Sequence, residues 1–596
     1  YMDRRHLIME TRDNNNEPTP GKTHVDCSYI SKEANEVLNI VPPYGGMRNT
    51  HDPRFPQLRT YGTFEYDFSN PQKIRSQKSG DLYPSPDFPE TESISFTNRH
   101  GENIVYPFYR TSDGTPCYLS AALWAEQKAA VCNKLPSIAQ KDPSGAAKIL
   151  AHLCRRYRFY EPYSDYYRVK YPMDIRLGPP YPYYGGFWSN WFYADLSYIA
   201  SIAEAYASII KTDAFEQLSV EYRQDIASEV RNIIEEGLDF VFSYGIQNTN
   251  MDASIWEGLI RIGSALEKPE YVHMALERID YFINHYYLFD GFFSEVTVSY
   301  HQMITNGVLR TLKRFSNYSD PTGYIYPGTG ERIDQPDLYK NYPLLESAAS
   351  IPEILQYPNG RTVTIQDSNS TLQTALSDVI YEPVLFPAAK IARLTNRSKI
   401  DPVQSIMNCQ PKYGHNHWDC LNISLFANGV ELLPDIGYTH TYNRRWAAST
   451  LAHNTVTVDG QESLRNPHGG NYIRFVPGNS FVNIVRATDS SCYDQTSIYD
   501  RETIMVPTGD IESSRYVLDI FRVKGGNRHE YSLNFCADYD TVTSMWPQHT
   551  GEEETMLPYG VPFLKPKEEL YQGEASGHYH GYMYVEDVKT LELKNQ

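Results

Sequence analysis

The segment Gly414-His415-Asn416-His417-Trp418-Asp419 concentrates side chains that can bind a metal ion or move a proton. In an extended strand alternate residues share one face. We therefore expect a strand here in which His415, His417 and Asp419 project together. The alternative is a hydrogen-bonded polar patch beneath a β-sandwich, and spacing alone leaves it open.

Two further side chains of the metal-binding type follow downstream. Asp435 lies in Leu433-Pro434-Asp435-Ile436-Gly437, and His453 lies in Ala452-His453-Asn454-Thr455. Neutral imidazoles with one carboxylate are a usual ligand set for zinc. The region thus predicts either a metal site or a satisfied polar cluster.

A second pattern is Ser299-Tyr300-His301, at the start of a predicted helix. A tyrosine can act as an acid or a base where its surroundings lower its pKa. Most Tyr-His pairs have only a structural role, so this pattern needs support from elsewhere.

The loop Gln247-Asn248-Thr249-Asn250-Met251-Asp252 precedes another predicted helix. An amide in this loop could bond a substrate carboxylate. Because Asn, Thr and Asp also favour the N-cap of a helix, an ordinary capping cluster is the alternative.

Aromatic residues are abundant: 13% of the chain, with 49 Tyr against 24 Phe. Tyrosine joins a flat apolar face to a hydroxyl, which suits contacts with sugar rings. They gather at residues 181–191, which include Tyr184, Asn190 and Trp191. This stretch predicts either a sugar-stacking wall or core packing.

Two kinds of periodicity organise the elements around these motifs. Apolar residues recur at helical spacing in seven segments, which predict helices over 117–134, 145–158, 189–211, 217–243, 252–267, 270–287 and 296–315. Beyond residue 358 the pattern alternates with period two, and turns such as Asn428-Gly429 separate the predicted strands. We predict an irregular cap over 1–112, an incomplete α/α toroid over 113–358 and an antiparallel β-sandwich over 359–596.

Composition excludes several classes of function. The formal charge of −19 argues against nucleic acid as a partner, because phosphate binding needs clustered Lys and Arg. No run of 18 or more apolar residues predicts a membrane span. Eight scattered Cys without a CxxC pair indicate neither a zinc ribbon nor a disulfide-dense scaffold. The chain starts at Tyr1 and its last strand-like run has no closing signal, so we expect a processed or truncated sequence that continues past Gln596.

Together these motifs resemble the heparinase II/III-like superfamily of polysaccharide lyases over roughly residues 180–540. The resemblance depends on the loop around Asn250, the Ser299-Tyr300-His301 motif and the block 414–419. It continues through 433–437 and 453–460 and ends at 515–526.

The resemblance implies a helical toroid packed on a β-sandwich and cleavage at C4 of a uronic acid by β-elimination. By position, Tyr300 and His415 match the family's catalytic pair, and Asn250 matches the residue that neutralises the substrate carboxylate. His417, Asp435 and His453 match a zinc site that is commonly structural. Family members often have His after the Asn, whereas this chain has Met251.

The other expected site residues are substrate contacts rather than catalytic groups. They are Gln247, Asn248, Tyr184, Asn190, Trp191, His301, Arg444 and Arg445. Arg444 and Arg445 could hold a carboxylate, although surface charge is the simpler explanation for at least one of them.

The expected partner is a uronate-containing glycan, and the resemblance implies a secreted or periplasmic location. Two rival functions stay open. A glycoside hydrolase on a similar toroid would need two carboxylates about 5–9 Å apart, for which Asp252, Glu257 and Glu295 are the candidates. A non-catalytic glycan-binding protein would keep the aromatic wall but would not need Tyr300 or His415.

Overall fold

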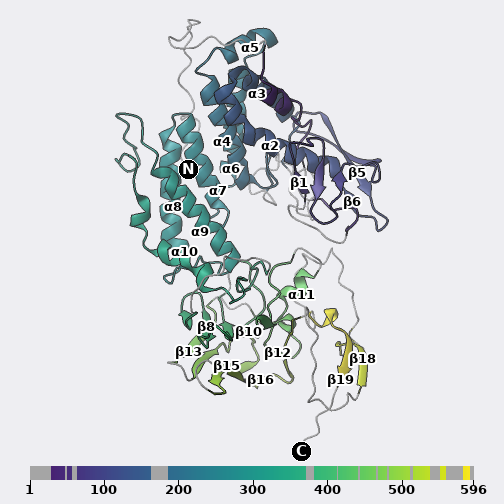
Figure 1. Cartoon of the computed structure of the whole chain (residues 1–596), viewed down its shortest axis with the longest axis vertical. Helices are drawn as coiled ribbons and strands as arrows, with labels where there is room; N and C mark the ends of the chain where they lie inside the picture. Colours follow the sequence, from purple (N-terminus) through teal and green to yellow (C-terminus); the bar gives the residue numbers. More distant parts are fainter. Residues whose placement is uncertain are drawn as a thin grey trace, which may run out of the picture. The chain divides into compact units, whose positions relative to one another are not determined.

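The computed structural model describes residues 29–46, 50–56, 64–162, 185–370, 381–411, 414–439, 443–464, 468–478, 482–509, 515–536, 551–558, 561 and 581–590. The chain forms two compact units (Figure 1). Unit 1 comprises residues 1–54, 62–246 and 261–271, and unit 2 comprises 55–61, 247–260 and 272–596. Helices α7 (Asp252–Ala265) and α8 (Pro269–Tyr286) are each divided between the units.

Unit 1 is mainly helical, with small antiparallel sheets near its start. Its helices are α1 (Lys32–Leu38), α2 (Leu119–Lys141), α3 (Pro143–Tyr157), α4 (Phe192–Ile209), α5 (Ala214–Tyr222) and α6 (Ile226–Ser243). Its strands are β1 (Phe64–Tyr66), β2 (Ile74–Ser76), β3 (Leu82–Tyr83), β4 (Glu92–Thr97), β5 (Asn103–Arg110) and β6 (Pro116–Cys117).

Helix α6 illustrates why these segments are helical. Val230, Ile233, Ile234 and Leu238 recur at three- and four-residue spacing and are buried on one face. The Asp225 side chain accepts a hydrogen bond from the backbone of Ser228 and caps the helix.

The single helix predicted over 217–243 is wrong, because the structure divides it into α5 and α6. Arg223 has a left-handed backbone (φ 52°), which ends α5. Asp225 then begins α6 as its N-cap. The apolar periodicity continues across residues 223–225, so the sequence pattern gave no indication of the break.

Unit 2 contains α9 (Val298–Phe315), α10 (Leu344–Ile354), α11 (Arg444–Ala448) and most of the β structure. One antiparallel sheet has the order β11-β10-β9-β8-β7, and the other has β13-β14-β15-β16. The first sheet consists of β7 (Val384–Phe386), β8 (Ile391–Thr395), β9 (Gln404–Asn408), β10 (Asn422–Ala427) and β11 (Val430–Leu433). The second consists of β13 (Asn471–Val476), β14 (Asn483–Thr488), β15 (Thr496–Pro507) and β16 (Arg515–Gly525).

These two sheets share a core and form the predicted sandwich. Leu394 and Met407 from the first sheet are buried with Val485 and Met505 from the second. Four short strands of unit 2 lie outside the two sheets: β12 (Val456–Val458) pairs with β17 (His529–Tyr531), and β18 (Gly551–Thr555) pairs with β19 (Glu586–Thr590).

The other face of the first sheet is covered by the helices of unit 2. A second apolar cluster joins Val298 at the start of α9 and Ile351 of α10 to Ile391, Ile406 and Phe426 of the sheet. In Figure 1 the sheet strands β8 and β10 lie directly below α9 and α10. Strands β8 and β9 are therefore buried on both faces, and the first turn of α9 is fixed close to the sheet.

Consecutive helices followed by antiparallel sheets confirm the predicted fold class, a helical toroid followed by a β-sandwich. The predicted boundaries after residues 112 and 358 stay predictions. No helix in the described ranges is both long enough and apolar enough to cross a membrane.

Candidate active site and metal centre

The rings of Tyr300 and His415 stack against each other in unit 2. Their centroids lie 3.9 Å apart and their planes differ by 19°. Tyr300 lies in the first turn of α9, where the Thr297 side chain caps the helix by accepting from the Tyr300 backbone. The two residues matched to the catalytic pair are thus in contact although 115 positions separate them.

His415 does not lie in a strand, so the predicted strand over 414–419 is wrong. The residues before β10 form turns and bends, and His415 has φ 61°, in the left-handed region. The period-two rule therefore does not apply to this loop. Its side chains are arranged by hydrogen bonds: Asp419 is buried and accepts from Gln366 and Asn408.

Asp367 connects the two histidines of the loop. Its carboxylate accepts from His415 Nδ1 at 2.9 Å and from His417 Nε2 at 3.0 Å. Arg444 donates to the same carboxylate. Burial alone would raise the pKa of Asp367, but the histidine bonds and the Arg444 charge hold this pKa far below its usual value. Asp367 is therefore an ionised acceptor.

Sequence reasoning missed Asp367, and the signal for it is weak. The residue follows Gln366, which comes directly after the mostly apolar run Val363-Thr364-Ile365. A carboxylate next to such a run is a candidate for a buried polar role, because an unpaired charge there is costly. Nothing in the local spacing identifies its partners, which lie 48 to 77 residues away.

Asn250 lies next to Glu295. Its Nδ2 donates to Glu295 Oε2 over 2.6 Å, and the same Oε2 lies 4.0 Å from His415 Nε2. Burial raises the pKa of Glu295, while His415 and the Asn250 hydrogen bond oppose this rise. The structure thus connects Asn250 to the Tyr300–His415 pair through a carboxyl that the motifs did not single out for this role.

Arg444 and Arg445 are not surface charges. Arg444 places its guanidinium 3.9 Å from the centroid of the Tyr438 ring and contacts Asp367, and its side chain is 22% exposed. Arg445 is buried in α11. Arg444 belongs to the hydrogen-bonded cluster around His415, whereas a substrate contact for Arg445 is disfavoured by its burial.

His301 requires a correction, because it has a structural position. It is fully buried, its Nδ1 accepts from the Phe293 backbone at 3.0 Å and its Nε2 lies 2.7 Å from the Ala348 carbonyl oxygen. Burial lowers its pKa to about 4. With both ring nitrogens engaged inside the chain, His301 has no atom left for a substrate.

The loop before α7 is organised around Asp252. Its carboxylate accepts from the Asn248 backbone at 3.0 Å and from the Thr249 hydroxyl at 3.1 Å. These hydrogen bonds are of the kind expected for an ordinary capping cluster, which was the alternative to a substrate-binding loop. Gln247 and Asn248 are half-buried, and their contact with substrate stays a prediction.

The aromatic stretch is partly core. Phe187 and Trp188 are buried in unit 1, and Trp188 stacks on Tyr157 with centroids 5.4 Å apart. Asn190 is buried and Trp191 half-buried, and Tyr184 lies outside the described residues. Their roles as substrate contacts stay predictions.

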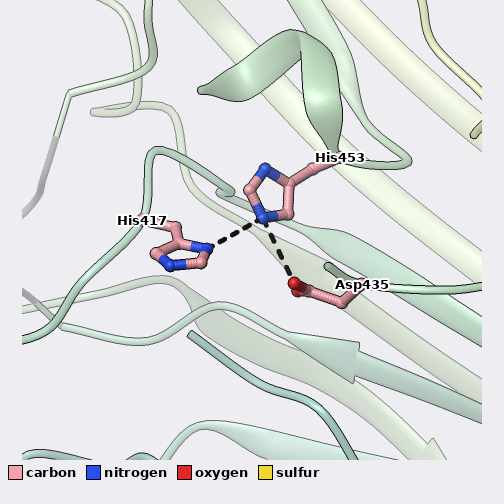
Figure 2. A group of neighbouring side chains, drawn as sticks. All are labelled: His417, Asp435 and His453. Atoms are coloured by element: carbon pink, nitrogen blue, oxygen red, sulfur yellow. Dashed lines mark hydrogen bonds and ion pairs between the residues drawn. The ribbon is translucent and has the colours of Figure 1, made fainter. Parts of the chain in front are cut away.

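His417, Asp435 and His453 form a candidate metal centre (Figure 2). One potential ligand atom from each residue lies within 4.8 Å of the others, and all three residues are buried. His417 Nδ1 lies 3.2 Å from His453 Nε2, which lies 3.5 Å from Asp435 Oδ2. The loop before β10, the segment after β11 and the segment after α11 each supply one of them.

The outward nitrogens of the two imidazoles are already used. His417 Nε2 bonds Asp367, and His453 Nδ1 lies 2.7 Å from the Ser449 carbonyl oxygen. A carboxylate or carbonyl behind a ligating histidine is the usual partner that fixes its tautomer. Burial raises the pKa of Asp435 because it disfavours the charged carboxylate. A bound cation would offset this cost of burying the charge. The donor set therefore fits a divalent metal such as zinc.

A disulfide adjoins this centre. Cys420, next to Asp419, is bonded to Cys492 in the turn between β14 and β15. Sequence spacing gave no indication of this pair. The bond ties the loop of His415 and His417 to the second sheet.

A family model matches the sandwich part of the chain. Residues 381–511 match the family model described as heparinase II/III-like, C-terminal. An alginate lyase of Stenotrophomonas maltophilia is 26% identical over 185 residues, which are 28% of this chain and 23% of that protein. An exo-oligoalginate lyase of Saccharophagus degradans is 26% identical over 145 residues, 21% of this chain and 19% of that protein. The chain thus spans less than a quarter of either relative.

Among solved structures, a crystal structure of heparinase III aligns with 87% of this chain and 76% of its own. The identity is 15% and the TM-score 0.49.

Proposed function

We propose that this chain belongs to the heparinase II/III-like family, whose C-terminal model matches residues 381–511, and that it is a polysaccharide lyase. The reaction is β-elimination at C4 of a uronic acid, which leaves a 4,5-unsaturated uronate at the new end. The two relatives named as alginate lyases support a uronate substrate. The single observation that carries the proposal is the contact between the rings of Tyr300 and His415.

The chemistry sets three demands. The C5 proton is weakly acidic while the carboxylate is charged, because its removal adds negative charge to the same group. Preorganised donors at that carboxylate lower this barrier. A base must then remove the proton, and an acid must protonate the departing O4.

His415 suits the base. Its Nδ1 bonds the ionised Asp367, so the proton of a neutral ring is assigned to Nδ1 and the lone pair to Nε2. Within the described residues Nε2 makes no hydrogen bond and lies 4.0 Å from Glu295. The side chain is 28% exposed, so a substrate proton can reach it.

Tyr300 suits the acid that protonates O4, because it stacks on His415 and starts a helix held by the sheet core. For a syn substrate Tyr300 can serve both proton transfers. Asn250 supplies a neutral amide donor for the uronate carboxylate, without the neighbouring His common in the family. The loop position of Asn250 and its link through Glu295 to His415 support this role.

His417, Asp435 and His453 would hold a zinc ion, whose chemistry here is structural: it would neutralise the buried carboxylate and tie three segments together. The Cys420–Cys492 disulfide supports a secreted or periplasmic location, since disulfides persist in oxidising compartments.

The hydrolase alternative has little support from the candidate carboxylates. Glu257 is paired with Arg314, and Asp252 is buried as the acceptor of its own loop. A retaining or inverting hydrolase needs two carboxyl groups free to face the sugar.

Mass spectrometry of the products tests the proposal. The chain is incubated with alginate and with other uronate glycans, including short oligomers. Elimination products add up to the mass of the substrate, whereas hydrolysis adds one water for each cleaved bond. Products carrying the added water would refute the lyase assignment.

A further inference from the structure

Glu295 holds a position that the proposed mechanism does not explain. It lies between Asn250 and His415, and its Oε2 accepts from Asn250 at 2.6 Å and approaches His415 Nε2 to 4.0 Å. Its side chain is 17% exposed, so it is largely enclosed but can still be reached. A Cβ added at Gly414 would lie 3.6 Å from its Oε1, so the loop backbone also borders this carboxyl.

The groups around Glu295 give its negative charge little compensation. Burial raises its pKa, with Asp367 adding to the rise, whereas His415 and the Asn250 bond lower it. Among the described residues, the side chain that forms an ion-pair contact with Glu295 is His415, at 4.0 Å, and no Arg or Lys does so. His415 in turn bonds Asp367, which is ionised.

A uronate carboxylate that reaches Asn250 also reaches Glu295, because the two side chains are hydrogen-bonded. The substrate carboxylate and an ionised Glu295 would repel each other at such close range, and in such pairs one carboxylate takes up a proton. Resting on the proposed function, we propose that Glu295 binds the uronate carboxylate directly as a neutral acid. Its hydroxyl donates to one carboxylate oxygen, and the second Nδ2 hydrogen of Asn250 donates to the substrate alongside it.

This arrangement supplies two uncharged donors where negative charge develops during elimination, without a cation. No bond to carbon changes at Glu295, and its proton remains shared with the substrate carboxylate. The direction of the pH effect follows. Binding is strongest where Glu295 is protonated and weakens as the pH rises through its pKa. At higher pH, binding takes up one proton.

Calorimetry on the full chain carrying Tyr300→Phe, which prevents turnover, measures this directly. Saturated mannuronate and glucuronate disaccharides are titrated in buffers of different ionisation heat, from mildly acidic to mildly alkaline. We expect proton uptake on binding at the alkaline end. Combining Glu295→Gln with Tyr300→Phe abolishes the proton uptake and the loss of affinity at alkaline pH. The amide still donates a hydrogen bond but does not titrate.

Glu295→Ala removes the donor and weakens binding roughly tenfold or more, as expected for a hydrogen bond to a charged group. Glu346→Gln, on the exposed first turn of α10, is the matched control and keeps the uptake. Proton uptake that persists in Glu295→Gln overturns the inference, and so does a failure to bind either disaccharide.

The two claims fail separately. Uronate binding with the expected proton uptake, but without unsaturated product from the unmodified chain, refutes the lyase assignment and retains Glu295. Unsaturated product together with unchanged uptake in Glu295→Gln refutes the role of Glu295 alone.

Discussion

The carboxylate of Asp367 accepts a hydrogen bond from Nδ1 of His415 over 2.9 Å. A buried acid behind an imidazole fixes the ring orientation and its tautomer, as in hydrolytic triads. The proposed base is therefore preorganised by a residue that need not touch the substrate. Because Asp367 also bonds His417, one side chain joins the proposed catalytic pair to the metal centre.

Asp367→Asn should lower kcat by roughly 100-fold, within the range expected for loss of general base catalysis, with little change in KM. The amide can present its N–H to Nδ1 and so favour the wrong tautomer. Steady-state kinetics on the glycan that the unmodified chain cleaves measure this effect. Metal content is measured in parallel, and Asp494→Asn, at an exposed position, is the control. An unchanged kcat with intact metal content contradicts the positioning role.

Removing the metal should destabilise unit 2 without unfolding unit 1. Elemental analysis should find about one zinc per chain, and a chelator should lower the thermal midpoint of one transition. A ligand present at 1,000 times its Kd stabilises the native state by about 4 kcal/mol. His453→Ala should show the lower midpoint without chelator. A purified chain that contains no metal, and whose thermal midpoint the chelator leaves unchanged, would rule out the site.

Breaking the disulfide should destabilise the sandwich. Cys420 and Cys492 are 72 residues apart, and the cross-link restricts the unfolded chain. Cys492→Ser should cost about 2–4 kcal/mol in denaturant unfolding, and reductant should have the same effect on the unmodified chain. Cys154→Ser, at a free cysteine of unit 1, is the control. Equal stability of the oxidised and reduced chains would contradict this expectation.

His301 should make stability depend on pH. Burial lowers its folded-state pKa from 6.5 to about 4, so the folded chain resists protonation that the unfolded chain accepts. Its contribution is complete above the unfolded value and is lost as the pH falls from about 6.5 to about 4. The loss amounts to about 3 kcal/mol.

Denaturant unfolding across that pH range measures this loss. His301→Gln should flatten the dependence, since an amide can both accept from Phe293 and donate to Ala348 without titrating. His285→Gln, on the exposed end of α8, should leave the slope unchanged. A slope that survives His301→Gln would show that the cause lies in another group.

Sequence patterns predicted the elements better than the connections between them. Periodicity located the core helices and strands because burial of one face imposes it, as for Val230, Ile234 and Leu238 in α6. It missed the break at Arg223, where a backbone angle rather than a change of pattern ends the helix. It also assigned residues 414–419 to a strand, although His415 has a left-handed backbone.

In the candidate site, too, local motifs could be recognised in the sequence, whereas contacts between distant residues could not. Tyr300, His415 and the three metal-type ligands were found because each stands in a recognisable local motif. Asp367 and Glu295 were not assigned their positions, because their roles depend on partners brought close by the fold. The Cys420–Cys492 pair is similar: its spacing of 72 residues carries no local signal.

Near-ultraviolet absorbance tests the central claim most directly, because β-elimination creates a conjugated double bond and hydrolysis does not. The chain and its Tyr300→Phe variant are incubated side by side with a panel of uronate glycans. We predict that absorbance rises on at least one glycan and that the rise disappears in the variant. A flat trace accompanied by new reducing ends, or a rise that Tyr300→Phe leaves unchanged, would contradict the account.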